Sequence, residues 1–141
     1  MNSNMVANGQ SVHVVPSRVG EVTTLAVDDH AAFRDVLRDL IDAAPGFFLV
    51  GEARSGEEAT RAVDVLAPQF VLMDVTMPGM GGIAAAREIV SRHPEVVVVL
   101  ISVNDPSLHP EVNALGGAVA CARKQDLRPR RLREFWEMHH N

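Results

Sequence analysis

The sequence predicts an α/β fold, in which a doubly wound, five-stranded parallel sheet carries helices on both faces. Short apolar stretches alternate along the chain with segments whose apolar residues recur at helical spacing. This alternation is typical of repeated β-α units with right-handed crossovers. Two of the apolar stretches, 70–73 and 96–101, contain no polar residue, as expected for strands that are covered by helices on both sides.

Composition limits the class of protein. The chain has 141 residues, of which 47% are hydrophobic and 22% charged, and this fits one soluble domain with a sizeable core. Its net charge of −5 argues against a general nucleic-acid binder. The single cysteine, Cys121, excludes a disulfide framework and a cysteine metal site. No apolar run approaches the length of a membrane span, so a cytoplasmic protein is expected.

The first 20 residues differ from the rest of the chain. They are rich in Asn, Ser and Gly and show no hydrophobic period, so residues 1–20 are predicted to be a flexible leader. They lack the basic start and apolar core of a secretory signal. An edge strand over 12–15 is the less favoured alternative. Residues 21–141 are then predicted to form the domain.

The first half of the domain reads as two β-α units. A strand is predicted over 22–27, followed by a helix with one apolar face that stops at Pro45. Residues 47–50 are predicted to be a short strand. Ser55 and Glu58 have the spacing of a capping box, which predicts the start of the next helix.

The second half continues this pattern, with one irregular segment. The strand over 70–74 is followed by a helix over 82–92, and the strand over 96–101 comes next. Two prolines then leave room only for a short helix, over 111–115. A weak strand over 118–122 and a last helix with a proline in its first turn complete the series.

The polar residues of interest all follow strands. Asp28 and Asp29 follow the first strand, Asp74 ends the third, Ser102 follows the fourth and Lys124 the fifth. The carboxyl ends of parallel strands meet at one edge, where ligands bind in open α/β sheets. Clustered carboxylates need a neutralising partner, and a Mg²⁺ ion or a lysine can supply it. A carboxylate nucleophile, a cation, a hydroxyl and an ammonium together favour phosphoryl transfer.

Simpler interpretations remain open for several of these residues. Asp28 and Asp29 are also suited to capping the helix that follows. His30 is interpreted as a solvent-facing neighbour rather than a metal ligand. The stretch 123–133 holds six basic residues and one acid, which fits either a solvated helix face or a surface that docks an acidic partner. Direct DNA contact is not favoured.

Four motifs carry a resemblance to a known family. They are V-D-D-H at 27–30, L-M-D-V-T-M-P-G-M-G-G at 72–82, L-I-S-V at 100–103 and G-A-V-A-C-A-R-K at 117–124. The sequence resembles the receiver domain of bacterial two-component response regulators over roughly residues 22–138. It is most similar to the receivers of helix-turn-helix regulators of the NarL/LuxR type. This resemblance implies the flavodoxin-like strand order 2-1-3-4-5.

The resemblance also implies roles for the acidic residues. Asp74 would be the phosphoacceptor, and a Mg²⁺ ion would be the cofactor. Asp29 would bind the metal directly and Asp28 mainly through water. Asp74 itself and the backbone carbonyl of Thr76 would complete the protein ligands.

Ser102 and Lys124 would form the phosphoryl-binding and switch part of the site. Ser102 would bind the phosphoryl group and shift on activation, and Lys124 would pair with that group. The chain departs from the family at Cys121, where many members have an aromatic switch residue. Pro106 and Pro110 disturb the segment where the family has its fourth helix.

Three hypotheses about function follow. The first is a receiver that a sensor histidine kinase phosphorylates, and that controls transcription through a homodimer or a partner protein at the fourth and fifth helices. Such a domain is a switch rather than an enzyme, apart from its own phosphorylation and dephosphorylation, and no output domain or membrane contact is expected. The second is a receiver-like interaction module that works without phosphorylation. The third, a phosphatase with an aspartate nucleophile, lacks room for a substrate-covering insertion.

Overall fold

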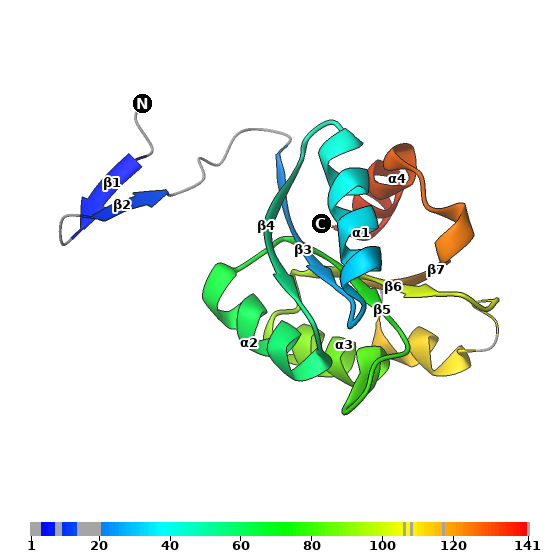
Figure 1. Cartoon of the computed structure of the whole chain (residues 1–141). Helices are drawn as coiled ribbons and strands as arrows, with labels where there is room; N and C mark the ends of the chain where they lie inside the picture. The colour runs from blue at the N-terminus through cyan, green and yellow to red at the C-terminus, as the bar shows by residue number, and fades with distance from the viewer. Residues whose placement is uncertain are drawn as a thin grey trace.

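The computed structural model describes residues 4–7, 10–13, 21–105, 107, 109–116 and 118–140. Within these residues, a five-stranded parallel sheet carries helices on both faces, as the sequence predicted (Figure 1). The strands of this sheet are β3 (Val22–Val27), β4 (Phe47–Ala53), β5 (Phe70–Asp74), β6 (Val97–Ser102) and β7 (Val119–Arg123). Their spatial order is β4-β3-β5-β6-β7, which is the predicted order 2-1-3-4-5.

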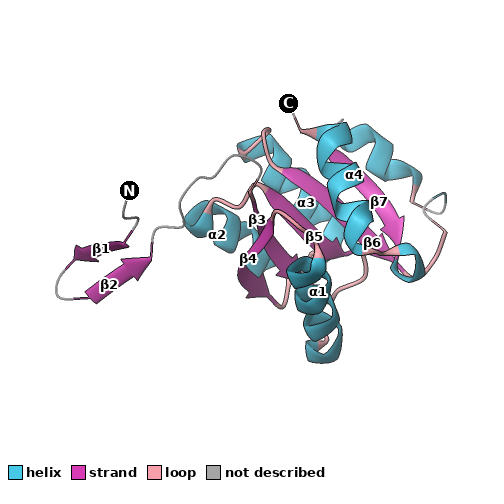
Figure 2. Ribbon diagram, turned by 90° about the horizontal axis from the view of Figure 1, so that it is seen from above, coloured by secondary structure: helices cyan, strands magenta, loops and turns pink. Residues whose placement is uncertain are grey.

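Helices cover the two faces of the sheet in pairs. The α-helices are α1 (Ala31–Ala43), α2 (Gly56–Leu66), α3 (Gly81–Arg92) and α4 (Pro129–His139). Two short 3₁₀ helices, η2 (Pro110–Leu115) and η3 (Lys124–Asp126), flank β7. Helices α1 and α4 lie against one face, while α2 and α3 lie against the other (Figure 2).

The period of the strands explains this two-sided core. Along β5, Phe70 and Leu72 point into the cluster beneath α1 and α4, whereas Val71 and Met73 point into the cluster beneath α2 and α3. All four side chains are fully buried, because successive residues of a strand face opposite sides of the sheet. The strand is therefore held by packing on both faces up to Asp74, its last residue.

The capping box predicted before α2 is present. The Ser55 hydroxyl accepts a hydrogen bond from the Glu58 backbone N–H at 3.0 Å, and the Glu58 carboxylate accepts one from the Arg54 backbone N–H at 2.8 Å. The second bond goes to the residue before the cap rather than to the cap itself. The first bond satisfies a backbone donor that the start of a helix leaves unpaired, and the second ties the preceding residue to the first turn.

Several elements differ by a single residue from the sequence-based prediction, and two differ by more than that or in type. Strand β4 continues to Ala53 rather than ending at residue 50, because it pairs with β3 as far as Val27, with a register shift between Thr24 and Leu25. The short helix after β6 is present, and it is a 3₁₀ helix that begins at Pro110. Proline has no backbone N–H, so the first position of a helix is where it fits.

The amino-terminal segment contains a separate pair of strands. Strands β1 (Asn4–Ala7) and β2 (Gln10–His13) pair antiparallel with each other and not with the larger sheet. Residues 12 and 13 thus lie in a strand, although its partner is β1. Most of the predicted leader falls outside the described residues, so the division at residue 21 and the leader's flexibility stay predictions.

Candidate functional site

Two buried carboxylates lie at the carboxyl edge of the sheet, on neighbouring strands. Asp28 follows β3 and has no exposed surface, and Asp74 ends β5 and is 5% exposed. Strands β3 and β5 pair through Val27 and Met73, so the two aspartates are the next residues on each strand. The predicted meeting of these two acids is confirmed.

Lys124 supplies the positive charge between them. Its Nζ lies 3.7 Å from Asp28 Oδ2 and 3.8 Å from Asp74 Oδ2. The ammonium also lies 4.1 Å from the centre of the Phe33 ring, on α1, where an aromatic face attracts a cation. One lysine therefore bridges two acids from different strands, and Phe33 helps to hold it there.

The pKa of Asp74 is raised from 3.8 to about 6. Burial is the largest cause, and the neighbouring charge of Asp28 is the second. The Thr76 backbone N–H, which donates to Asp74 Oδ1 at 3.2 Å, and the Lys124 charge act in the opposite direction. A carboxyl group whose pKa is shifted this far from its ordinary value is a candidate functional group.

Asp28 and Asp29 each have a buried carboxylate oxygen that accepts no hydrogen bond among the described residues. Asp28 Oδ1 accepts a hydrogen bond from the His30 backbone N–H at 2.8 Å. Asp28 Oδ2 and Asp29 Oδ1 are buried and have no hydrogen-bond partner among the described residues. Both acids and His30 place ligand atoms within 4.8 Å of one another. Buried carboxylate oxygens of this kind fit a hard cation such as Mg²⁺.

His30 lies beside this cluster, but it faces solvent. Its side chain is 72% exposed, and Nδ1 lies 3.4 Å from Asp28 Oδ1 and 3.2 Å from Asp29 Oδ1. The oxygens are the ligands that Mg²⁺ prefers, and an exposed imidazole adds little to such a site. This placement agrees with the interpretation of His30 as a neighbour of the acids.

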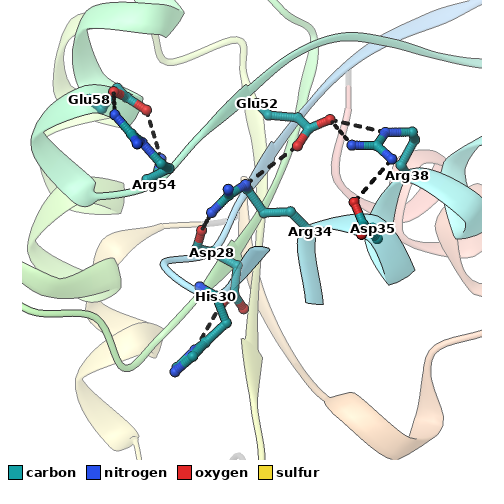
Figure 3. A network of polar contacts seen from close by, with 8 residues as sticks. All are labelled: Asp28, His30, Arg34, Asp35, Arg38, Glu52, Arg54 and Glu58. Carbon is teal, nitrogen blue, oxygen red and sulfur yellow. Dashed lines mark hydrogen bonds and ion pairs between the residues drawn. The ribbon is translucent and has the colours of Figure 1, made fainter. Parts of the chain in front are cut away.

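Polar contacts of Arg34, Arg38 and Glu52, here called the strap, fix the loop that carries Asp28 and Asp29. These contacts were not predicted from the sequence. Arg34 on α1 donates to the backbone carbonyl of Asp28 at 2.8 Å, and its Nε lies 3.4 Å from Glu52 on β4 (Figure 3). Glu52 also accepts two hydrogen bonds from Arg38, at 2.8 and 3.1 Å. The loop is thus tied to both α1 and β4. The only signal in the sequence is an arginine five residues after Asp29.

A glycine allows α3 to begin close to the end of β5. A side chain at Gly82 would place its Cβ 2.1 Å from the Asp74 carbonyl oxygen, which is far inside van der Waals contact. The Gly82 N–H donates to the Val75 carbonyl at 3.0 Å. Upstream, Gly79 has a φ of +80°, a conformation that glycine adopts without strain. The motif around Met77 and Pro78 therefore serves to turn the chain tightly beneath Asp74.

Ser102 is the last residue of β6, which pairs with β5 in the sheet. Asp74 pairs with Ile101 across the sheet, so Ser102 is the next residue along. Its hydroxyl accepts a hydrogen bond from the Asn104 N–H at 3.0 Å and lies 3.1 Å from His109 Nε2. Ser102 is only 3% exposed. Contact with His109 was not predicted, because no spacing rule links the two residues.

The basic segment near the carboxyl end is partly engaged within the domain. Arg131 pairs with Glu134 at 2.8 Å, and Arg133 donates to the Pro45 carbonyl at 3.2 Å. These contacts favour the interpretation as a helix face, while docking of an acidic partner stays a prediction. Among the described residues, no helix is both long enough and apolar enough to cross a membrane.

Comparison with known proteins agrees with this geometry. The family model of the response regulator receiver domain matches residues 24–134. The chain belongs to this family. Receiver domains are phosphoacceptor switches of two-component systems and interact with histidine kinases. The family resemblance inferred from the sequence is confirmed, and an interaction module independent of phosphorylation is not favoured.

Similar proteins include transcription-related regulators. Response regulator GacA of Pseudomonas viridiflava is 36% identical over 103 residues, which are 73% of this chain and 48% of that protein. Transcriptional regulatory protein DegU of Brevibacillus brevis is 32% identical over 85 residues, which are 60% of this chain and 36% of that protein. The chain thus spans about half or less of the length of these relatives.

Solved structures of receiver domains are similar to this one over most of the chain. The response regulator domain of Thermotoga maritima CheB has a TM-score of 0.73 at 27% identity, and the match covers 84% of this chain and 96% of that one. The signal receiver domain of a NarL response regulator from Mycobacterium tuberculosis has a TM-score of 0.69 at 26% identity, covering 82% and 96%. The receiver fold is therefore shown.

Proposed function

We propose that this receiver domain takes a phosphoryl group onto Asp74 from a sensor histidine kinase, with Mg²⁺ as cofactor. One observation carries the proposal: the buried carboxylates of Asp74 and Asp28 lie at the ends of neighbouring strands, and the ammonium of Lys124 is within 3.8 Å of both. These are the parts that phosphoryl transfer to a carboxylate requires.

Each residue has a role in the proposed transfer. A carboxylate oxygen of Asp74 attacks the phosphorus, so an O–P bond forms while the P–N bond to the kinase histidine breaks. The electron pair of that bond returns to the imidazole. Lys124 stabilises charge on the phosphoryl oxygens, and the Ser102 hydroxyl donates a hydrogen bond to one of them.

The acid pair would hold the metal. Asp29 and Asp74 would contribute carboxylate oxygens, Asp28 would bind mainly through water, and the Thr76 backbone carbonyl would contribute a further oxygen. When bound, Mg²⁺ neutralises charge on the phosphoryl group and orients it towards Asp74. Asp28 Oδ2 and Asp29 Oδ1 support this assignment, because both are buried and neither accepts a hydrogen bond among the described residues. Lys124 lies near Asp28 Oδ2, at 3.7 Å, so a metal ion would add the charge that Asp29 lacks from that lysine.

Transmission of the signal is proposed by analogy with the relatives. GacA is a response regulator and DegU a transcriptional regulatory protein, so a role in transcription regulation is the favoured output. The added charge of about −1.5 to −2 biases the domain towards a second conformation. A homodimer or a downstream protein would read this change near η2, β7 and α4, and the cytoplasm is the expected compartment.

Intact-mass measurement tests the proposal. The wild-type protein is incubated with a small phosphodonor, with and without Mg²⁺, beside Asp74→Asn. We expect one added phosphoryl mass only in the wild type and only with Mg²⁺. If the folded wild type gains no mass from the donor or from any histidine kinase tried, the phosphorylation proposal fails.

A further inference from the structure

The Ser102 hydroxyl is held from two sides in this domain. The Asn104 backbone N–H donates to it at 3.0 Å, and His109 Nε2 lies 3.1 Å from it on the other side. Ser102 is 3% exposed, so water has little access to the hydroxyl. Its hydrogen-bonding capacity is thus committed largely to these two neighbours.

The single proton of this hydroxyl decides what Ser102 can do. A serine hydroxyl has one proton to donate and two lone pairs to accept with. The Asn104 N–H already occupies one lone pair. A phosphoryl group offers only acceptor oxygens, so Ser102 can bind it only by donating its proton. An imidazole nitrogen that accepts the same proton therefore competes directly with the phosphoryl group.

His109 is also connected to a surface element. It directly precedes η2, and the Val112 N–H donates to the His109 carbonyl at 3.1 Å. Val112 is 4% exposed and belongs to the core cluster beneath α2 and α3. The imidazole thus joins the end of β6 to a 3₁₀ helix that packs on the core through Val112 and exposes the residues on either side of it.

We infer that His109 is a positioning residue for Ser102, an inference that rests on the proposed phosphorylation of Asp74. In the unphosphorylated domain, His109 Nε2 accepts the Ser102 proton and holds the hydroxyl in its resting orientation. A phosphoryl group on Asp74 takes that proton, the contact with His109 breaks, and η2 is released from the site. Strand β7 has the small side chain of Cys121 where many receivers have an aromatic switch residue. The contact between Ser102 and His109 would instead transmit the change at Asp74 to η2.

A double-mutant cycle separates this role from a merely structural one. The rate of phosphorylation by phosphoramidate with Mg²⁺ is measured for the wild type, His109→Ala, Ser102→Ala and the double variant. We expect His109→Ala to raise the rate about 2- to 10-fold, the range that one such hydrogen bond supplies. In the Ser102→Ala background, the same change should have no effect. Equal rates for wild type and His109→Ala, or equal ratios in both backgrounds, overturn the inference.

A conservative variant tests the chemistry of the contact. His109→Gln keeps a side-chain acceptor near the position of Nε2, so it should restore the slow rate of the wild type. Thermal unfolding checks that each variant is folded. If His109→Gln and His109→Ala are equally fast although both are folded, the acceptor role is wrong.

Nitrogen-15 NMR of the histidine rings reads the contact directly. Phosphorylation of the wild type should move the Nε2 signal of His109, and neither Asp74→Asn nor Ser102→Ala should show this change. The ring of His93, which pairs with Asp64 at 2.8 Å away from the site, serves as the internal control. An unchanged His109 signal in phosphorylated wild type overturns this inference alone, whereas a wild type that cannot be phosphorylated overturns the proposed function.

Discussion

Replacing Asp74 with Asn should stabilise the metal-free domain at neutral and alkaline pH. The pKa of Asp74 is raised from 3.8 to about 6, mainly by burial and then by the charge of Asp28. A raised carboxyl pKa means that the folded state resists the charged form, so the ionised group lowers stability above the folded pKa. Asparagine removes this charge, and its carbonyl can still accept the bond from Thr76.

The size of the gain follows from the shift. At about 1.4 kcal/mol for each pKa unit, a shift of about two units lowers the free energy of unfolding by about 3 kcal/mol at pH 8. The penalty disappears as pH falls through 6 towards 4, because Asp74 then becomes protonated in the folded state. At pH 4.5 the difference between Asp74→Asn and wild type should be about 1 kcal/mol.

Urea unfolding in a metal chelator measures this difference at both pH values. Asp42→Asn is the matched control, since Asp42 is an exposed carboxylate on α1 and its replacement should change stability little at either pH. The account is refuted if Asp74→Asn is no more stable than wild type at pH 8, or if its advantage is the same at pH 4.5.

Three further variants test the surroundings of the acceptor. Lys124→Met should raise the pKa of Asp74 further, because the lysine lowers it, and NMR titration of the carboxyl carbon would detect an unchanged or lower pKa as a contradiction. Arg34→Ala should weaken Mg²⁺ binding severalfold in calorimetry, because it loosens the loop that carries Asp28 and Asp29. The control Arg54→Ala, at an exposed residue, should not weaken it. Equal affinities for the two variants would show that Arg34 does not support the metal site. Gly82→Ala should lower the free energy of unfolding by roughly 1–3 kcal/mol or more, because its Cβ would overlap the backbone carbonyl at the end of β5. Wild-type stability in chemical unfolding would contradict that close approach.

The strands and the acidic edge of the site could be predicted because they depend on local pattern. Uninterrupted apolar runs locate β5 and β6, and the rule that parallel strands end at one edge brings Asp28, Asp74 and Lys124 together. The extent of β4 could not be predicted, since Gly51 and Glu52 have the composition of a loop. Pairing with β3 overrides that local preference.

The contacts that support the site could not be predicted from the sequence, for a different reason. The ring of Phe33, on α1, lies 4.1 Å from the ammonium of Lys124, a residue some ninety positions away in the chain. Arg34 and Glu52 come from elements that meet only when the sheet forms. His109 contacts Ser102 through the fold of the loop between them, which the seven-residue separation does not predict. Such contacts depend on the tertiary fold, so periodicity and motif spacing carry no information about them.

Chemical mapping of the phosphorylated residue tests the central claim most directly. After treatment with the phosphodonor and Mg²⁺, borohydride reduces an acyl phosphate to an alcohol, which converts an aspartyl phosphate into homoserine. Peptide sequencing by mass spectrometry should then find homoserine at position 74 and aspartate at positions 28 and 29. Homoserine at either of those two positions, or a phosphoryl group that remains on another type of residue, would contradict the assignment of Asp74 as the phosphoacceptor.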